Sequence, residues 1–180
     1  MTDTVGAGLS AEDRLMIHDL YARYAWAEDQ GDLDAFADCF TEDAVVRLLD
    51  EARGRDEIRR REERFVAEDS GFPGAQHFAS QLEITGGDGR AEVRAYAARL
   101  HRIPGTTSGQ LLWQGFYTDR CERHAGRWYF SLKWAHPAEH VRLREAAGVP
   151  RVIARPYYHH GDTAFGHTAP RELGTTKYGE

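Results

Sequence analysis

Cysteine is scarce in this sequence of 180 residues, which contains only Cys39 and Cys121. The pair follows neither a CxxC pattern nor a Cys/His zinc spacing, and nothing marks it as a disulfide framework. We therefore expect two small thiols that are buried or half-buried. Near the C-terminus stand residues of the metal-binding kinds, but their irregular spacing argues against a metal site: His159, His160, Asp162 and His167.

Long apolar runs and concentrated positive charge are absent as well. No stretch of 18 apolar residues occurs, so no membrane span is expected, and the opening MTDTVGAGLSAED lacks the basic segment and apolar core of a secretory signal. The net charge is −6 and the 23 Lys and Arg residues are dispersed, which argues against nucleic acid as the main partner. We expect a cytoplasmic protein that binds neither nucleic acid nor a membrane.

The residues that are present suit one globular domain. Apolar residues make up 41% of the chain and charged residues 29%, and a single domain commonly holds about 100–200 residues. We predict a disordered N-terminus over residues 1–9, a domain over 10–135 and a C-terminal extension over 136–180. Periodicity is lost from about Pro137, with a short helix predicted over 138–147. The aromatic residues of the extension suggest that it packs on the domain or on a partner subunit.

Helical signals dominate the first half of the chain. Ser10 before Ala-Glu-Asp is a helix N-cap pattern, and buried-face spacing predicts a helix from about Ala11 to Asp29 that stops at Gly31. Asp32 can cap a second, shorter helix that reaches Phe40. A charge-rich helix over 55–68 has few apolar anchors, namely Ile58, Phe65 and Val66. Its opposite charges, spaced four residues apart, predict a solvated outer face.

Strands make up the remainder. We predict a first strand over 44–49 after a turn at 41–43, then strands over 76–84, 90–103, 110–123 and 127–134. Glycine-rich segments at 86–89 and 124–126 form the tight turns. The order helix, helix, strand, helix and four antiparallel strands predicts an α+β fold in which one curved, mixed or antiparallel sheet wraps over about three helices.

Three segments in this order resemble those of SnoaL-like proteins of the nuclear-transport-factor-2-like superfamily. YARYAWAEDQGDLDAFADCFTEDAVV (21–46) resembles their opening, in which a helix ends in an aspartate and F-T-x-D-A leads into a strand. GRWYFSLKW (126–134) resembles their closing strand. GAQHFASQLEI (74–84) resembles the segment that carries an active-site histidine in scytalone dehydratase and hexachlorocyclohexane dehydrochlorinase. The resemblance covers residues 10–135 and implies a cone-shaped domain.

The same resemblance implies a site. Asp29 falls on the family's helix-end aspartate, His77 on its strand histidine, and Tyr24 near the tyrosines of bile-acid dehydratases and scytalone dehydratase. His101 lies near a second active-site histidine of scytalone dehydratase without aligning cleanly. Counterparts of that enzyme's hydroxyl-bearing substrate residues are not found.

The chemistry of these residue types agrees with a catalytic pair. An imidazole accepts a proton at cellular pH, and a carboxylate on its other nitrogen fixes the tautomer and stabilises the imidazolium. Such a pair needs no metal and no cofactor, and Tyr24 can donate a hydrogen bond to a substrate oxygen. Each residue also has a structural interpretation: a helix-terminal Asp29, a strand histidine and a core tyrosine.

The direction of His77 stays open at this stage. On a regular strand His77 shares a face with Ala79, whereas Phe78 and Ile84 share the other face. If the second face packs on the helices, His77 points outward unless a bulge near Phe78 shifts the alternation.

We expect a cofactor-independent lyase, dehydratase or isomerase acting on an aromatic or polycyclic small molecule. Four further residues are candidates for substrate binding: Tyr96, His101, Trp113 and Tyr117. Trp113 and Tyr117 lie on one strand face and can equally build a core. The alternatives are a polyketide-cyclase-type enzyme, or a non-catalytic scaffold like the β-subunits of ring-hydroxylating dioxygenases. The family resemblance also implies a homodimer or homotrimer.

Overall fold

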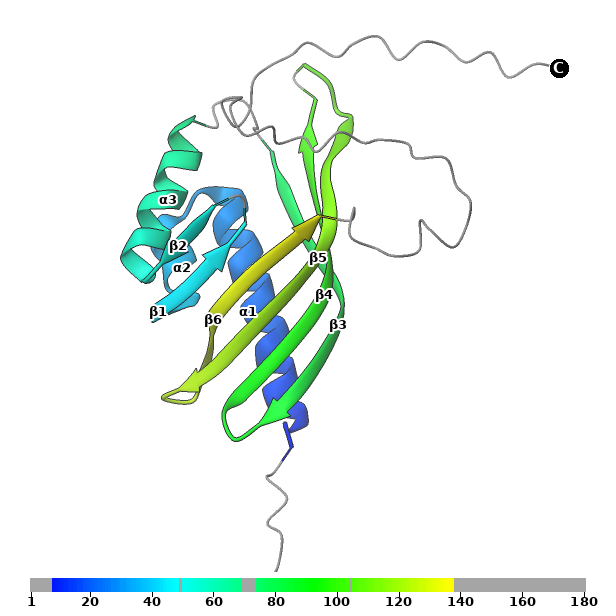
Figure 1. Cartoon of the computed structure of the whole chain (residues 1–180). Coiled ribbons are helices and arrows are strands. Elements are labelled where there is room, and N and C mark those ends of the chain that lie inside the picture. Colours follow the sequence, from blue (N-terminus) through cyan, green and yellow to red (C-terminus); the bar gives the residue numbers. More distant parts are fainter. Residues whose placement is uncertain (1–7, 49, 69–73, 104, 138–180) are drawn as a thin grey trace, which may run out of the picture. The chain divides into compact units, whose positions relative to one another are not determined.

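The fold combines helices with one mixed sheet (Figure 1). The structure, a computed structural model, describes residues 8–48, 50–68, 74–103 and 105–137. The helices are α1 (Ala11–Gln30), α2 (Leu33–Ala37) and α3 (Arg55–Glu68). The strands are β1 (Phe40–Arg47), β2 (Glu51–Arg53), β3 (Gln76–Gly87), β4 (Arg90–Arg102), β5 (Gly109–His124) and β6 (Arg127–Pro137).

The six strands lie in the order β2-β1-β6-β5-β4-β3. All neighbouring pairs are antiparallel except β1 and β6, which are parallel. Figure 1 shows the curved sheet with α1 crossing one of its faces. We call this the inner face. It carries the buried side chains that pack on α1: Val93, Ala95, Tyr117, Trp128, Phe130 and others. The predicted α+β class and curved mixed sheet are confirmed.

Local capping chemistry sets the ends of α1. The Ser10 side chain accepts a hydrogen bond from the Asp13 backbone while Asp13 reaches back to Ser10, so a capping box opens the helix. Gly31 ends it with φ 68°, a left-handed conformation that costs glycine little. Asp32 then accepts from the Ala35 backbone N–H at 3.0 Å and opens α2. Both helices are confirmed, although α2 ends three residues earlier than predicted.

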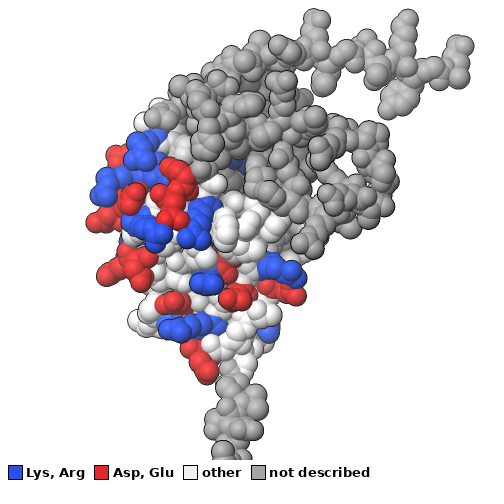
Figure 2. All heavy atoms as spheres, viewed as in Figure 1, with Lys and Arg blue, Asp and Glu red and all other residues white. Residues whose placement is uncertain are grey.

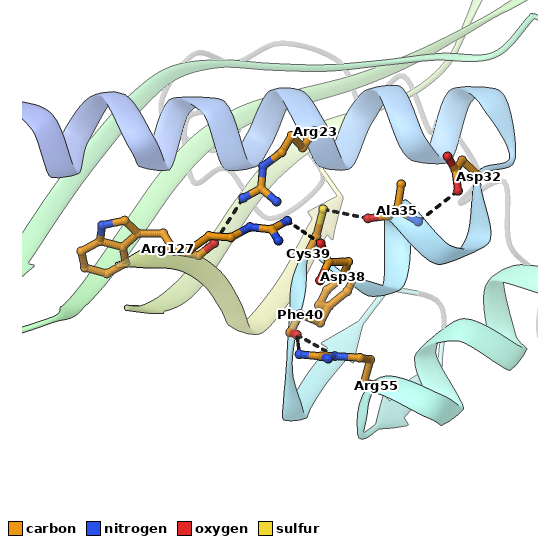
Figure 3. Close-up of polar contacts among 9 residues, drawn as sticks. Arg23, Asp32, Ala35, Asp38, Cys39, Phe40, Arg55 and Arg127 are labelled. Carbon is orange, nitrogen blue, oxygen red and sulfur yellow. Dashed lines mark hydrogen bonds and ion pairs between the residues drawn. The ribbon is translucent and has the colours of Figure 1, made fainter. Parts of the chain in front are cut away.

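The junction between α2 and β1 is fixed by several polar contacts (Figure 3). The thiol of Cys39 points back to the Ala35 carbonyl at 3.4 Å, and the Arg55 guanidinium donates to the Phe40 carbonyl at 2.9 Å from Nε. Arg127 of β6 pairs with Asp38. Cys39 and Cys121 are both buried and free, as predicted.

The strand boundaries depart from the predictions at both ends of the sheet. β1 begins at Phe40 because it pairs there with Phe130 of β6, so the turn predicted at 41–43 is wrong. β2 was not predicted, and β6 continues to Pro137, two residues into the predicted extension. Gly8 pairs with Gly87, so order begins inside the predicted disordered segment. The helix predicted over 138–147 lies outside the described residues.

The charge-rich helix α3 is only partly solvated. Ile58, Arg61, Glu62 and Phe65 follow helical spacing, and the first three are buried. Arg61 reaches this position because its guanidinium pairs with Asp50 at 2.6 Å and lies 4.4 Å from the centre of the Phe65 ring. Ile58 and Phe65 were predicted as apolar anchors of this helix, whereas the burial of Arg61 and Glu62 beside them was not predicted. On the surface that Figure 2 shows, the two signs of charge are interspersed.

A bulge in β3 decides which side chains reach the inner face. Ser80 pairs with Tyr96 and Glu83 with Arg94, so β3 advances three residues while β4 advances two. Gln81 sits at this point with φ 50°. The extra residue reverses the alternation, so that Ala79 before the bulge and Leu82 after it both pack against the core. A bulge near Phe78 was named as one condition for an inward-facing His77, and the bulge that β3 contains lies at Gln81.

No helix among the described residues is both long and apolar enough to cross a membrane.

Candidate active site

Asp29 and His77 meet where the C-terminal end of α1 lies against the start of β3. The Nδ1 atom of His77 lies 2.6 Å from Oδ1 of Asp29. The backbone N–H of His77 also donates to both carboxylate oxygens, at 3.1 Å each. Because a carboxylate only accepts hydrogen bonds, Nδ1 carries the proton of this contact. Asp29 therefore fixes both the position of the strand residue and the tautomer of its ring.

The second ring nitrogen of His77 faces another carboxylate. Nε2 lies 3.3 Å from Oε1 of Glu28, the residue before Asp29 on α1. The three side chains are mostly buried, with 10% of His77, 12% of Glu28 and 16% of Asp29 exposed. The imidazole thus lies between two carboxylates supplied by one helix end.

The sequence analysis missed Glu28. A signal for it exists, since two consecutive acidic residues stand in the last turn of α1, where the helix dipole disfavours negative charge and no basic residue offsets it. Only Asp29 was interpreted this way, because the family resemblance singled it out. Glu28 has the same unfavourable position at the C-terminal end of α1, so its position also indicates a role in the site.

A row of inner-face side chains continues from His77 across the sheet. His77 pairs with Arg99 of β4, and Arg99 pairs with Trp113 of β5. Trp113 stacks on Tyr117 with ring centroids 6.0 Å apart. His101 follows Arg99 by two residues on β4, so it belongs to the same face, one step further along the strand. Trp113, Tyr117 and His101 therefore share the face that His77 occupies.

Two buried tyrosines keep their protons in this environment. Burial, followed by the charge on Glu28, raises the pKa of Tyr24 well above its ordinary value. Burial, the charges on Glu28 and Asp119 and, more weakly, that on Asp29 raise the pKa of Tyr117, against the opposing effect of Arg99. Both hydroxyls therefore remain potential donors near the carboxylates. Tyr24 is also a core residue, with its ring 5.2 Å from that of Phe36.

A buried ion pair lies next to this cluster. Lys133 of β6 is fully buried and its Nζ lies 3.0 Å from Oδ2 of Asp119. The same ammonium lies 3.6 Å from the centre of the Tyr117 ring and 4.5 Å from that of Tyr24. The rings of Tyr24 and Tyr117 therefore pack against the Lys133 ammonium through cation–π contacts.

Tyr96 lies apart from the other predicted site residues. Its neighbours on β4, Ala95 and Ala97, are buried on the inner face, so Tyr96 points to the opposite face and is 66% exposed. There it lines a groove of about 370 Å³ together with Phe78 and Phe116. The structure therefore separates Tyr96 from Asp29, His77, Tyr24, Trp113 and Tyr117.

The side chains of the site are of the kinds used in proton transfer. Within the described parts of the chain, no group of three His, Cys, Asp or Glu side chains is placed to hold a metal ion. What the site offers is an imidazole with a fixed tautomer, two carboxylates and protonated tyrosine hydroxyls, which is the equipment of general acid–base chemistry.

Comparisons with known proteins agree with this fold. The family described as the SnoaL-like domain matches residues 9–132. No curated protein sequence matches the chain.

Several solved structures match as well. A protein of unknown function with a cystatin-like fold from Nostoc punctiforme has 23% identity and a TM-score of 0.64, covering 75% of this chain and 98% of its own. Two proteins come from Novosphingobium aromaticivorans. One, provisionally named an aromatic ring hydroxylase, has 29% identity and a TM-score of 0.62, covering 72% and 91%. The other, provisionally named a scytalone dehydratase, has 23% identity and a TM-score of 0.61, covering 73% and 90%.

Proposed function

The chain belongs to the SnoaL-like domain family, and we propose that it is a cofactor-independent lyase of the dehydratase kind. Its substrate is a hydrophobic aromatic or polycyclic small molecule. Asp29 and His77 form the general acid–base pair.

One observation carries the proposal, the 2.6 Å contact between His77 Nδ1 and Asp29 Oδ1. With an anionic partner on Nδ1, the second ring nitrogen, Nε2, is the atom that can exchange a proton. The same partner stabilises the imidazolium that forms when Nε2 takes up the proton. The two further hydrogen bonds from the His77 backbone to the same carboxylate hold the pair in one geometry. A surface histidine with an incidental partner would lack this double attachment.

The reaction that suits such a pair is elimination next to an activating carbonyl. The site removes a proton from the carbon beside the carbonyl, and the electron pair of that C–H bond forms the new carbon–carbon double bond. The bond from the next carbon to its hydroxyl oxygen breaks, and the leaving hydroxide takes up the proton and departs as water. Tyr24 or Tyr117 would donate a hydrogen bond to the carbonyl oxygen as negative charge develops there.

The aromatic substrate class is supported by the side chains around the pair. Trp113 and Tyr117 stack on the inner face, and their flat rings can accept another ring by offset stacking. The solved structure with 29% identity carries a name that refers to an aromatic ring, which supports the ligand class but not the reaction.

Site variants of the full chain test this function. A set of aromatic β-hydroxy ketones is screened for water loss, which extends the conjugated system and changes the ultraviolet absorbance. We expect His77→Gln and Asp29→Asn each to lower turnover by about 10²–10⁴-fold, as for the loss of a general acid–base group. Ligand binding should change little.

Two matched variants serve as controls. His124→Gln and Asp34→Asn alter the same residue types at exposed ion pairs, so turnover should stay at the wild-type level. Unchanged turnover in both site variants would contradict the proposal. If the wild-type chain turns over none of the compounds and the two site variants lose ligand binding, the result would instead favour a non-catalytic ligand-binding subunit.

A further inference from the structure

We propose that Glu28 is the substrate-facing carboxylate of this site and exchanges the reacting proton through its Oε2 oxygen. This inference rests on the proposed function, and it moves the proton-exchanging role from the His77 ring to Glu28. Asp29 and His77 then act behind Glu28, as positioning and charge-balancing partners.

The geometry around His77 points to this division of roles. An Asp–His pair acting alone must present Nε2 to the substrate, but here Nε2 lies 3.3 Å from Glu28 Oε1 while Nδ1 is occupied by Asp29. Both nitrogens of the ring therefore face carboxylate oxygens of α1. The second oxygen of the Glu28 carboxylate, Oε2, takes part in neither of these contacts.

That second oxygen, Oε2, is buried and has no hydrogen-bond partner in the described parts of the chain. An orphaned carboxylate oxygen of this kind is costly, because burial removes the hydrogen bonds that water would give it. The cost is offset when a donor enters the site. A substrate that brings a hydrogen to Oε2 would supply that missing partner.

The charge on Glu28 also acts on both candidate donors. It is the next largest cause, after burial, of the raised pKa of Tyr24 and of Tyr117. Glu28 is thus within electrostatic reach of the two hydroxyls proposed to bind a carbonyl oxygen. Proton acceptor and hydrogen-bond donors would then act on the same part of the substrate.

The proton balance of the elimination closes through Glu28. Oε2 takes the proton from the carbon beside the carbonyl, and the C–H electron pair forms the double bond as the carbon–oxygen bond breaks. Oε2 then returns the same proton to the leaving hydroxide, and water departs. Throughout, the His77 ring, whose Nε2 lies 3.3 Å from Oε1, would balance the charge on the carboxylate when the ring is protonated. No oxidant, reductant or second reactant is needed.

The base can be probed before the natural substrate is known. The probe is 5-nitrobenzisoxazole, in which removal of one carbon-bound proton breaks the N–O bond and releases a coloured cyanonitrophenolate. We expect Glu28→Gln to lower this rate by at least tenfold, together with His77→Gln and Asp29→Asn. Glu12→Gln, an exposed change on the same helix, should leave the rate unchanged.

The outcomes separate the two proposals. A wild-type rate in Glu28→Gln, with lowered rates in the His77 and Asp29 variants, overturns the role of Glu28 and leaves the Asp–His pair standing. A rate that none of the three variants lowers overturns the proposed function and the role of Glu28 with it.

Nuclear magnetic resonance of the imidazole N–H protons tests the contact independently of turnover. At a pH low enough to protonate the ring, we expect slowly exchanging signals from both ring protons of His77 in the wild-type protein. Glu28→Ala should remove the Nε2 signal and keep the Nδ1 signal, and Asp29→Asn should do the reverse. An Nε2 signal that survives Glu28→Ala overturns the inference.

Discussion

Lys133 places an ammonium group inside the hydrophobic core, where charged residues are rare. Its charge is compensated by Asp119, which also accepts hydrogen bonds from the Tyr21 hydroxyl at 2.5 Å and from the Trp134 backbone at 3.0 Å. Four aromatic rings, those of Tyr21, Tyr24, Tyr117 and Phe130, lie within 4.9 Å of the ammonium. Each charge of this pair therefore depends on the other, because no water reaches either.

Lys133→Met should accordingly lower the free energy of unfolding by about 3–5 kcal/mol, since it leaves the Asp119 carboxylate buried without its cation. Urea denaturation measures this change. Arg94→Met is the matched control, because the Arg94–Glu83 pair is exposed and its loss should have little effect. Adding Asp119→Asn to Lys133→Met should recover part of the lost stability. Equal losses of unfolding free energy in Lys133→Met and Arg94→Met would contradict this account.

At the scale of elements, the helix ends and the hairpin strands β3 to β6 followed from local rules, whereas the start of β1 and the existence of β2 did not. Ser10, Gly31 and Asp32 act on backbone groups within a few residues of themselves, so the ends of α1 are readable from the sequence. The start of β1 depends instead on pairing with β6, which is distant along the chain. β2 is too short for its alternation to predict a strand, and it forms by pairing with β1. The burial of Arg61 likewise depends on Asp50, outside its own helix.

The candidate site was predictable only in part, for the same reason. Asp29 and His77 were found because a family resemblance placed them, whereas strand alternation left the direction of His77 open. The bulge at Gln81 allows His77 and Ile84 both to face the helices. The residues around Gln81 carry no pattern that predicts this bulge. Glu28 became visible only once β3 was placed against the end of α1.

Gln81 therefore offers a test of how the bulge holds β3 in register. At φ 50°, a β-branched side chain is strained, so Gln81→Val should destabilise the protein by about 1–2 kcal/mol although valine favours strands elsewhere. Gln81→Gly should be tolerated. Thermal or urea unfolding gives the comparison, with Thr85→Val as an exposed control on the same strand. A stabilising effect of Gln81→Val would show that the bulge is not held in this conformation.

Five buried weak acids lie in the core on the inner side of the sheet, whereas Tyr96 lies on the opposite face. Tyr21, Tyr24, Tyr117, Cys39 and Cys121 all belong to the core between the inner face and the helices. Burial raises the pKa of each of them, and that of Cys39 rises from 9.0 to about 11. The core, the Lys133–Asp119 pair and the candidate site thus lie between the same face of the sheet and the helices. Ionisation of the buried tyrosines and cysteines should therefore lower the free energy of unfolding.

The stability of the molecule should consequently fall in alkaline solution. A raised pKa in the folded state means that the unfolded chain releases its proton first, so the stabilisation is complete below the ordinary thiol pKa of 9.0 and is lost as the pH rises toward 11. Urea denaturation at pH 7.5, 9, 10 and 10.5 should show a constant free energy of unfolding up to about pH 9 and a progressive fall above it. Replacing Cys39 and Cys121 by alanine should move the onset toward pH 10, where the tyrosines of the unfolded chain begin to ionise. A free energy of unfolding that stays level to pH 10.5 would mean that these groups ionise as easily in the folded core as in the unfolded chain.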